Sequence, residues 1–253
     1  MRFLAVHGQN FPALTVAAAI LFAVSACYAA PPESFQYAVE WRLIPAGTAK
    51  LSWMPVQRAQ PATEVRLHLE SAGLVSRLFR VDDDYRALLG SNLCAENVVL
   101  TAKEGNRNKE TRVTFDAKTG KASWVEKDLV RNATSSKEVE IPPCVHDVMG
   151  GLMALRGLRL EPGKTLRLPI SDGKKFVQAR IEAQDREDIK TPLGTFRAVR
   201  YEIFLFNDVL FKRAGHLHIW LTDDERRIPV QLQVRFPFTI GTITFRLLKD
   251  EKQ

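Results

Sequence analysis

The sequence predicts a mostly β protein, built on a single curved antiparallel sheet or a barrel-like sheet that one central helix covers. Many short segments alternate apolar and polar residues with a period of two. Turn-forming residues separate these segments about every 8 to 12 residues. Only one longer segment carries its apolar residues at helical spacing. Strong curvature or closure is favoured because it leaves fewer strand edges exposed.

The N-terminal segment has the layout of a secretory signal peptide. Arg2 provides a basic start, and the run Phe11–Val24 is apolar and uncharged. This run is short for a membrane span, which needs about 20 apolar residues, and small residues follow it. We therefore expect residues 1–29 to be a signal peptide and residues 30–253 to form an exported, periplasmic β domain of a bacterial cell envelope.

Two cleavage sites compete in this segment. The small residues at Cys27-Tyr28-Ala29 suit an ordinary signal peptidase, whereas Val24-Ser25-Ala26-Cys27 resembles a lipobox ending at Cys27. Acylation of Cys27 would hold the mature protein on a membrane surface, and no other feature predicts membrane contact. The sequence leaves both alternatives open.

The charge of the chain argues against nucleic acid as a partner. The 253 residues carry a net charge of +7, and removing Arg2 with the signal peptide leaves 35 basic and 29 acidic residues, or +6. The basic residues alternate with acidic and apolar ones, without a run of five like charges. Such a surface has at most a weak attraction for anionic lipid.

The first half of the domain begins with Phe35–Leu43, where every odd position is apolar. Pro45-Ala46-Gly47 predicts the first turn, and Asp116–Gly120 predicts a hairpin turn. Leu74–Val81 is ambiguous, and Asp82–Asp84 lacks calcium-loop spacing, so we interpret it as a solvated turn or strand end. The further strands are expected at Ala49–Trp53, Val65–Leu69, Thr111–Phe115 and Ala122–Val125.

The helix is expected at Val145–Leu158, although Gly150-Gly151 weakens it in the middle. Its place between two β-rich halves suggests that it covers an open sheet or plugs a barrel end. Asp147 in its first turn is interpreted as a capping residue rather than a general base. The strands of the second half are expected at Leu166–Pro169, Phe176–Ala183, Phe196–Phe206, His216–Leu221, Ile228–Phe236 and Ile243–Leu247, with turns at Ser171–Gly173 and Thr222–Glu225.

Two thiols remain in the mature domain, Cys94 and Cys144. In an oxidising compartment an isolated pair is most simply a disulfide. The alternative is two buried reduced cysteines, and neither residue lies in a Cys-x-x-Cys motif.

Few residues are candidates for metal binding or catalysis. His216 and His218 point to the same strand face and are weak candidates for a metal site, but a third ligand is not identifiable, since His68 or His146 would have to come from elsewhere. No motif assembles a nucleophile, a base and an orienting group, so we expect neither catalytic residues nor a cofactor.

The tryptophans Trp41, Trp53, Trp124 and Trp220 all lie on expected strands. One interpretation is a conventional core. The other is an aromatic-lined cavity, because wide β-barrels and half-barrels hold apolar ligands.

Several spaced motifs resemble the DUF3108 family of exported bacterial proteins of unknown function. They are FQYAVEWRLIPAGTAKLSW (35–53), the helix after Pro142-Pro143, PGKTLRLPISDGKK (162–175), TPLGTFRAVRYE (191–202) and HIWLTDDERRIPVQLQV (218–234). The resemblance covers roughly Phe35 to Leu248 and implies an envelope protein without a transferable activity. A more distant similarity is to periplasmic carriers of the LolA/LolB type, whose curved sheets hold acyl chains under a helical lid.

We therefore expect a non-catalytic envelope protein that binds or carries an apolar ligand, such as a lipid or an acyl chain. An envelope scaffold that binds other envelope proteins through a strand edge is the first alternative. A metal-dependent hydrolase using His216 and His218 is the second.

Overall fold

The computed structural model of the chain describes residues 32–90 and 92–252, so the expected signal peptide and Cys27 lie outside the described residues. The first half comprises β1 (Glu33–Trp41), β2 (Ile44–Val56), β3 (Ala62–Ser71), α1 (Gly73–Leu78), β4 (Val81–Leu89), β5 (Ala95–Glu104), β6 (Arg107–Asp116), β7 (Lys121–Asp128) and β8 (Ala133–Glu140). The second half comprises α2 (Val148–Gly157), β9 (Thr165–Ser171), β10 (Phe176–Thr191), β11 (Gly194–Phe204), β12 (His216–Thr222), β13 (Pro229–Arg235) and β14 (Thr242–Lys252).

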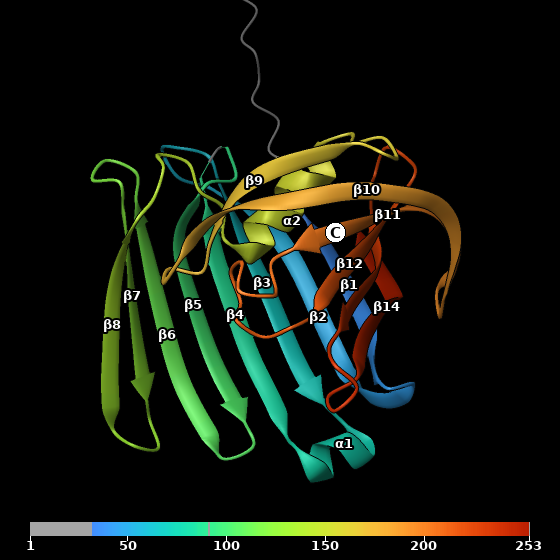
Figure 1. Cartoon of the computed structure of the whole chain (residues 1–253), viewed down its shortest axis with the longest axis horizontal. Helices are drawn as coiled ribbons and strands as arrows, with labels where there is room; N and C mark the ends of the chain where they lie inside the picture. Colours follow the sequence, from blue (N-terminus) through green and yellow to red (C-terminus); the bar gives the residue numbers. More distant parts are fainter. Residues whose placement is uncertain (1–31, 91, 253) are drawn as a thin grey trace, which may run out of the picture.

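The described strands form one 14-stranded antiparallel sheet in the order β8-β7-β6-β5-β4-β3-β2-β1-β14-β13-β12-β11-β10-β9 (Figure 1). Each half is a meander, and the first and last strands of the chain pair with each other in the middle of the sheet. The sheet is not closed, because its two end strands, β8 and β9, do not pair with each other. The predicted curved antiparallel sheet with a covering helix is confirmed.

Alternation along the strands separates a buried face from an exposed one. In β1 the side chains of Phe35, Tyr37 and Val39 are buried, and the same period continues across the sheet. The second half folds over the concave face of the first, and α2 lies between them (Figure 1).

A short parallel bridge draws the two halves together. His146, just before α2, pairs with Ile170 of β9, and the carbonyl of Val145 accepts a hydrogen bond from the amide of Ala95 in β5 (2.7 Å). Strands β6, β7 and β8 extend beyond this bridge as an outer part of the sheet (Figure 1).

The first turn and the strand β8 differ from what the sequence predicted. The predicted first turn at Pro45–Gly47 is wrong, because the chain reverses at Arg42 and Leu43, with φ of 50° and 69°, and Ile44 already begins β2. Positive φ at both turn residues matches the twist of a hairpin, although this turn usually selects Asn-Gly. Strand β8 was not predicted because it is exposed at almost every position and shows no apolar alternation.

Candidate ligand-binding cavity

The start of α2 is fixed by Asp147, which the structure confirms as its capping residue. The carboxylate accepts hydrogen bonds from the amides of Met149 (3.1 Å) and Gly150 (2.9 Å), and the Tyr85 hydroxyl of β4 donates to it as well. Burial raises the pKa of Asp147. The helix begins at Val148 rather than at Val145, because the preceding residues pair with strands.

The paired glycines of α2 are packing points. A Cβ atom on Gly151 would lie 2.6 Å from Cδ1 of Ile170, and one on Gly150 would lie 3.1 Å from Cδ2 of Leu89. Both glycines are buried. The two glycines weaken the helix in isolation, but because they have no side chain they let it approach β4 and β9 more closely than any other residue would allow.

The expected disulfide is present. Cys94, in the turn between β4 and β5, is bonded to Cys144, which lies three residues before the cap of α2, and the Cα atoms are 5.1 Å apart. The bond ties the entry of the helix to the first half of the sheet.

An apolar cavity of about 260 Å³ lies between α2 and the concave face. The helix contributes Val148, Met149, Leu152 and Leu155 to its wall. Among the described residues that line the cavity, Tyr37 is the only titratable side chain, and burial raises its pKa far above the usual range. The remaining lining residues are Ala49, Leu51, Leu67, Gly151, Ile170, Ile181, Ile203, Leu205, Phe206, Phe211, Leu217, Ile219, Leu232, Val234 and Phe245.

One end of the cavity is covered by the loop between β11 and β12. The rings of Phe206 and Phe211 in this loop pack in a tilted arrangement at 5.3 Å between centroids, and Phe206 also meets Phe236 edge-on at 5.5 Å. The amides of Leu210 and Phe211 both donate to the carbonyl of Leu205, so the loop is folded on itself.

A second, mixed groove of about 270 Å³ adjoins the cavity, since Val148 and Phe211 line both. Its other walls come from the outer part of the sheet, including Trp124, and from the β9–β10 turn. The ammonium of Lys174 in that turn lies 4.4 Å from the centroid of the Trp124 ring. The groove adds polar and charged groups beside an otherwise apolar space.

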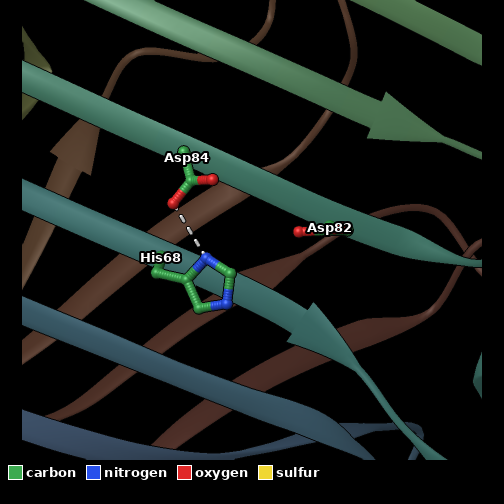
Figure 2. A group of neighbouring side chains, drawn as sticks. All are labelled: His68, Asp82 and Asp84. Atoms are coloured by element: carbon green, nitrogen blue, oxygen red, sulfur yellow. Dashed lines mark hydrogen bonds and ion pairs between the residues drawn. The ribbon is translucent and has the colours of Figure 1, made fainter.

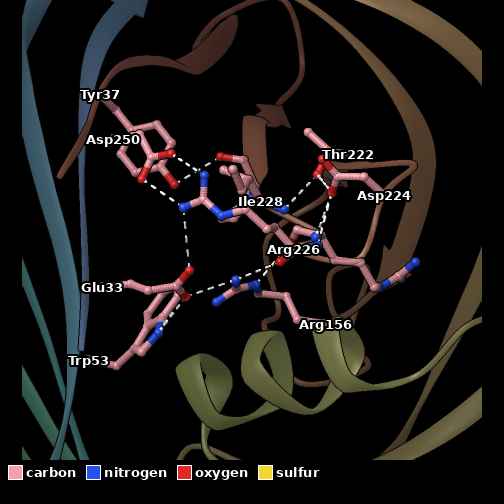
Figure 3. Close-up of polar contacts among 11 residues, drawn as sticks. Glu33, Tyr37, Trp53, Arg156, Thr222, Asp224, Arg226, Ile228 and Asp250 are labelled. Carbon is pink, nitrogen blue, oxygen red and sulfur yellow. Dashed lines mark hydrogen bonds and ion pairs between the residues drawn. The ribbon is translucent and has the colours of Figure 1, made fainter. Parts of the chain in front are cut away.

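The other end of α2 is held by a polar latch (Figure 3), which we define as Glu33, Arg156, Arg226 and Asp250. Arg156 in the last turn of α2 pairs with Glu33 of β1 (2.9 Å) and donates to the carbonyls of Arg226 (2.8 Å) and Arg227 (2.9 Å). Arg226 in turn pairs with Asp250 of β14 at 2.6 Å. Burial lowers the pKa of Arg156, while the charge of Glu33 opposes that shift.

The carbonyls that Arg156 binds are presented by a tight turn between β12 and β13. Asp224 accepts hydrogen bonds from the Thr222 hydroxyl (2.6 Å) and from the amides of Arg226 (3.1 Å) and Arg227 (3.0 Å). The Thr222 oxygen accepts one from the amide of Ile228 (2.8 Å). The segment from Trp220 to Asp224, which carried part of the family resemblance, therefore builds the receptor for the helix end.

The tryptophans are distributed differently from the aromatic-lined cavity that one reading of the sequence suggested. None of the four lines the apolar cavity, and only Trp124 lines the adjoining groove. Trp53 is a core residue whose ring packs at a tilt against Phe35 (5.1 Å between centroids) and whose indole N–H donates to Glu33 (2.8 Å). Trp220 points to the opposite face of β12 and donates to Glu187 (2.8 Å).

The two candidate metal ligands share a strand face but engage a carboxylate. Nδ1 of His216 lies 2.9 Å from Oε1 of Glu202, and Nε2 of His218 lies 3.9 Å from its Oε2. In the part of the chain that the structure describes, this pair does not belong to any group of three or more His, Cys, Asp or Glu residues whose ligand atoms all lie within 4.8 Å of one another. His146 is also committed elsewhere, since its Nδ1 lies 2.7 Å from the carbonyl of Leu93.

The set that does meet this distance is His68, Asp82 and Asp84 on β3 and β4 (Figure 2). His68 binds Asp84 at 2.9 Å, and Asp82 is paired with Lys103 (3.6 Å). The histidine and Asp84 are exposed, so these side chains form an ordinary polar cluster on the outside of the sheet.

Sequence reasoning missed Glu33 and Arg156, and it missed the phenylalanines of the β11–β12 loop. Glu33 precedes the first alternating strand, and Arg156 looks like a solvated helix residue, so neither gives a local signal. Phe206 was expected at the end of the strand Phe196–Phe206, whereas β11 ends at Phe204, and Phe211 lies in a segment without period-two alternation. Within residues 32–90 and 92–252, neither helix has the length and apolar character needed to span a membrane.

A family model described as a protein of unknown function, DUF3108, matches residues 36–248. No curated protein matches the chain. Among solved structures, the chain is similar to a beta-barrel-like protein of domain of unknown function DUF1849 from Brucella abortus, with a TM-score of 0.56 and 10% sequence identity. The match covers 88% of this chain and 98% of that chain. At this identity the likeness shows a shared fold alone.

Proposed function

The chain belongs to the DUF3108 family, and we propose that it is a non-catalytic, exported binding protein for an apolar ligand, such as a lipid or an acyl chain. The observation that carries this proposal is the apolar cavity beneath α2. The proposal places the mature protein in the periplasm, in keeping with the signal-like N-terminal segment.

The size and lining of the cavity support an apolar occupant. Apolar cavities of about 150 Å³ stay dry and take up small hydrocarbons, and this one measures about 260 Å³. A hydrocarbon chain in this space would remove its own apolar surface and that of the lining from water, which is worth roughly 25 cal/mol per Å².

The chemistry of the lining supports binding rather than turnover. General acid–base catalysis needs a positioned titratable group near its operating pH. Tyr37 donates its hydroxyl to the carbonyl of Pro229 (2.9 Å), and its raised pKa keeps it neutral. The adjoining groove, with Lys174 and Glu126 in its wall, offers charged groups to a polar head of the ligand.

Filling the cavity tests the proposal. Leu217→Trp on β12 places a larger side chain in the cavity, whereas His216→Trp changes the neighbouring residue on the exposed face. We expect native mass spectrometry of the wild type and of His216→Trp to show co-purifying lipid, and displacement assays with a fluorescent fatty acid to give the same affinity for both. Leu217→Trp should lose the lipid and bind the probe at least about tenfold more weakly. Equal binding by Leu217→Trp, or an empty wild-type protein that takes up no probe, would refute the proposal.

A scaffold role is the second candidate, and the exposed edge strand β8 favours it. Ala133–Glu140 pairs only with β7, and its other edge is free for strand addition. Lys137, Glu138 and Glu140 place charges along that edge, which discourages unselective pairing. A charge-preserving proline substitution, Ser136→Pro, should abolish partner capture if this edge is used and should leave the lipid content unchanged.

A further inference from the structure

Six of the chain reversals lie at the same end of the sheet. In an antiparallel meander alternate turns share an end, so the turns after β1, β3, β5 and β7 lie together. The pairing of Trp41 with Ile243 brings the β13–β14 turn to that end, and the pairing of His216 with Arg235 adds the β11–β12 loop. Helix α1 and the turns after β1, β5 and β7 appear in the lower part of Figure 1.

Exposed apolar side chains are concentrated at this end. Of the ten large hydrophobic residues that are exposed in the described chain, eight lie here. The β1–β2 turn, α1 with the residue after it, and the β13–β14 turn form a continuous group that we call the apolar rim. It consists of Leu43, Ile44, Leu74, Leu78, Phe79 and Phe238.

The parts of the rim are joined by direct contacts. The guanidinium of Arg42 donates to the carbonyls of Phe238, Thr239 (3.0 Å) and Ile240 (3.2 Å), which fixes the β13–β14 turn beside the β1–β2 turn. The amide of Ala72, just before α1, donates to the carbonyl of Ala46 in β2 (2.7 Å). The rim is therefore one surface rather than a set of independent tips.

Folding does not explain the apolar side chains of the rim. Phe238 is 90% exposed and Leu43 is 80% exposed, so neither gains much from packing. Leu43 also has a φ of 69°, a left-handed conformation that costs a side chain of this kind energy and that Asn or Gly adopts more easily. An unfavourable residue held at an exposed turn points to a function outside the fold.

Cations flank the rim. Arg42, Arg77, Arg80 and Arg107 are all exposed there. Among the described residues, Arg77 and Arg107 form no ion pair with a carboxylate, while Asp82 is shared between Arg80 (3.7 Å) and Lys103 (3.6 Å). Apolar tips interspersed with uncompensated arginines match the interface of an anionic bilayer, where the arginines meet headgroups and the tips enter the acyl boundary.

We propose that the apolar rim docks this protein on the surface of an anionic lipid bilayer. Protruding side chains can insert into a fluid interface without shape complementarity, whereas a protein partner needs a closely packed surface. The β11–β12 loop that covers the cavity lies at the same end of the sheet, so docking would bring the cavity near the membrane. The proposal stands whether or not the cavity holds a ligand.

Flotation of the purified mature protein with lipid vesicles tests the docking. The wild type should bind phosphatidylglycerol vesicles, lose most of that binding at high salt, and bind phosphatidylcholine vesicles weakly. Leu43→Asn combined with Leu78→Asn should reduce binding at least about tenfold, because two leucines no longer leave water. Arg77→Gln should reduce binding to the anionic vesicles about fivefold and leave binding to the neutral ones unchanged.

Two controls separate docking from damage to the fold. Leu43→Asn alone should keep or raise the melting temperature, since Asn suits the left-handed turn, while it weakens vesicle binding. Leu193→Asn removes an exposed leucine from the β10–β11 turn, at the other end of β11, and should bind vesicles as the wild type does. Wild-type protein that binds neither vesicle would overturn the proposal and assign the rim to a protein partner. Full binding by the double variant would overturn it as well.

Discussion

Replacing Arg156 by methionine should destabilise the protein, because this residue holds the end of α2 over the cavity. Arg156 is 11% exposed in its side chain and its partner Glu33 is 16% exposed, so the pair is largely buried. Breaking a buried pair by removing one partner costs about 3 to 5 kcal/mol, since a charge is left without compensation. Glu33 keeps a hydrogen bond from Trp53 and an ion pair with Arg226 at 3.6 Å, so we expect a loss near 3 kcal/mol.

The measurement is urea denaturation of the oxidised, delipidated protein, in which the midpoint should fall while the slope stays constant. Arg159→Met is the matched control, because Arg159 pairs with Glu225 where the two side chains are 63% and 90% exposed, and it should cost less than about 0.5 kcal/mol. The double variant Glu33→Gln with Arg156→Met should lose less than the sum of the single losses. If Arg156→Met costs no more than Arg159→Met, the latch does not stabilise the helix.

Two further predictions concern covalent and acid–base stability. Replacing Cys94 and Cys144 together by serine should lower the free energy of unfolding by about 4 kcal/mol for a sequence separation of 50 residues, measured by denaturation, and a loss below about 1 kcal/mol would contradict the entropic argument. Burial, with repulsion from Glu104, raises the pKa of Asp83 to about 6 from its ordinary 3.8. The folded state therefore binds a proton at Asp83 more tightly than the unfolded state does. This proton stabilises the folded state below pH 3.8, and the contribution is lost as the pH rises through about 6. Because the carboxyl is only half-buried, Asp83→Asn should raise stability by about 1 to 2 kcal/mol at pH 7 and by much less near pH 4, and a gain independent of pH would refute this reasoning.

The strands and turns of the fold differ in how clearly the sequence predicted them. The alternation in β1 predicted a half-buried strand because neighbouring side chains on a strand point to opposite faces, a property of the local backbone. The β8 strand has the same backbone but almost no buried position, so it left no such signal. The turn at Arg42 and Leu43 was missed because its residues are not the ones that this turn conformation favours.

The sequence by itself determined the features that depend on near neighbours or on residue chemistry alone: the amphipathic strands, the cap at Asp147 and the interpretation of an isolated pair of cysteines as a disulfide. Tertiary structure decided the features that depend on residues far apart in the chain. Glu33 meets Arg156 across 123 residues, and the Tyr37 hydroxyl meets the Pro229 carbonyl across 192. The cavity beneath α2 likewise exists only because β1 pairs with β14 and folds the second half over the first. Periodicity reports which face of a strand is buried, but it does not specify which distant element covers that face or how completely it fills the space.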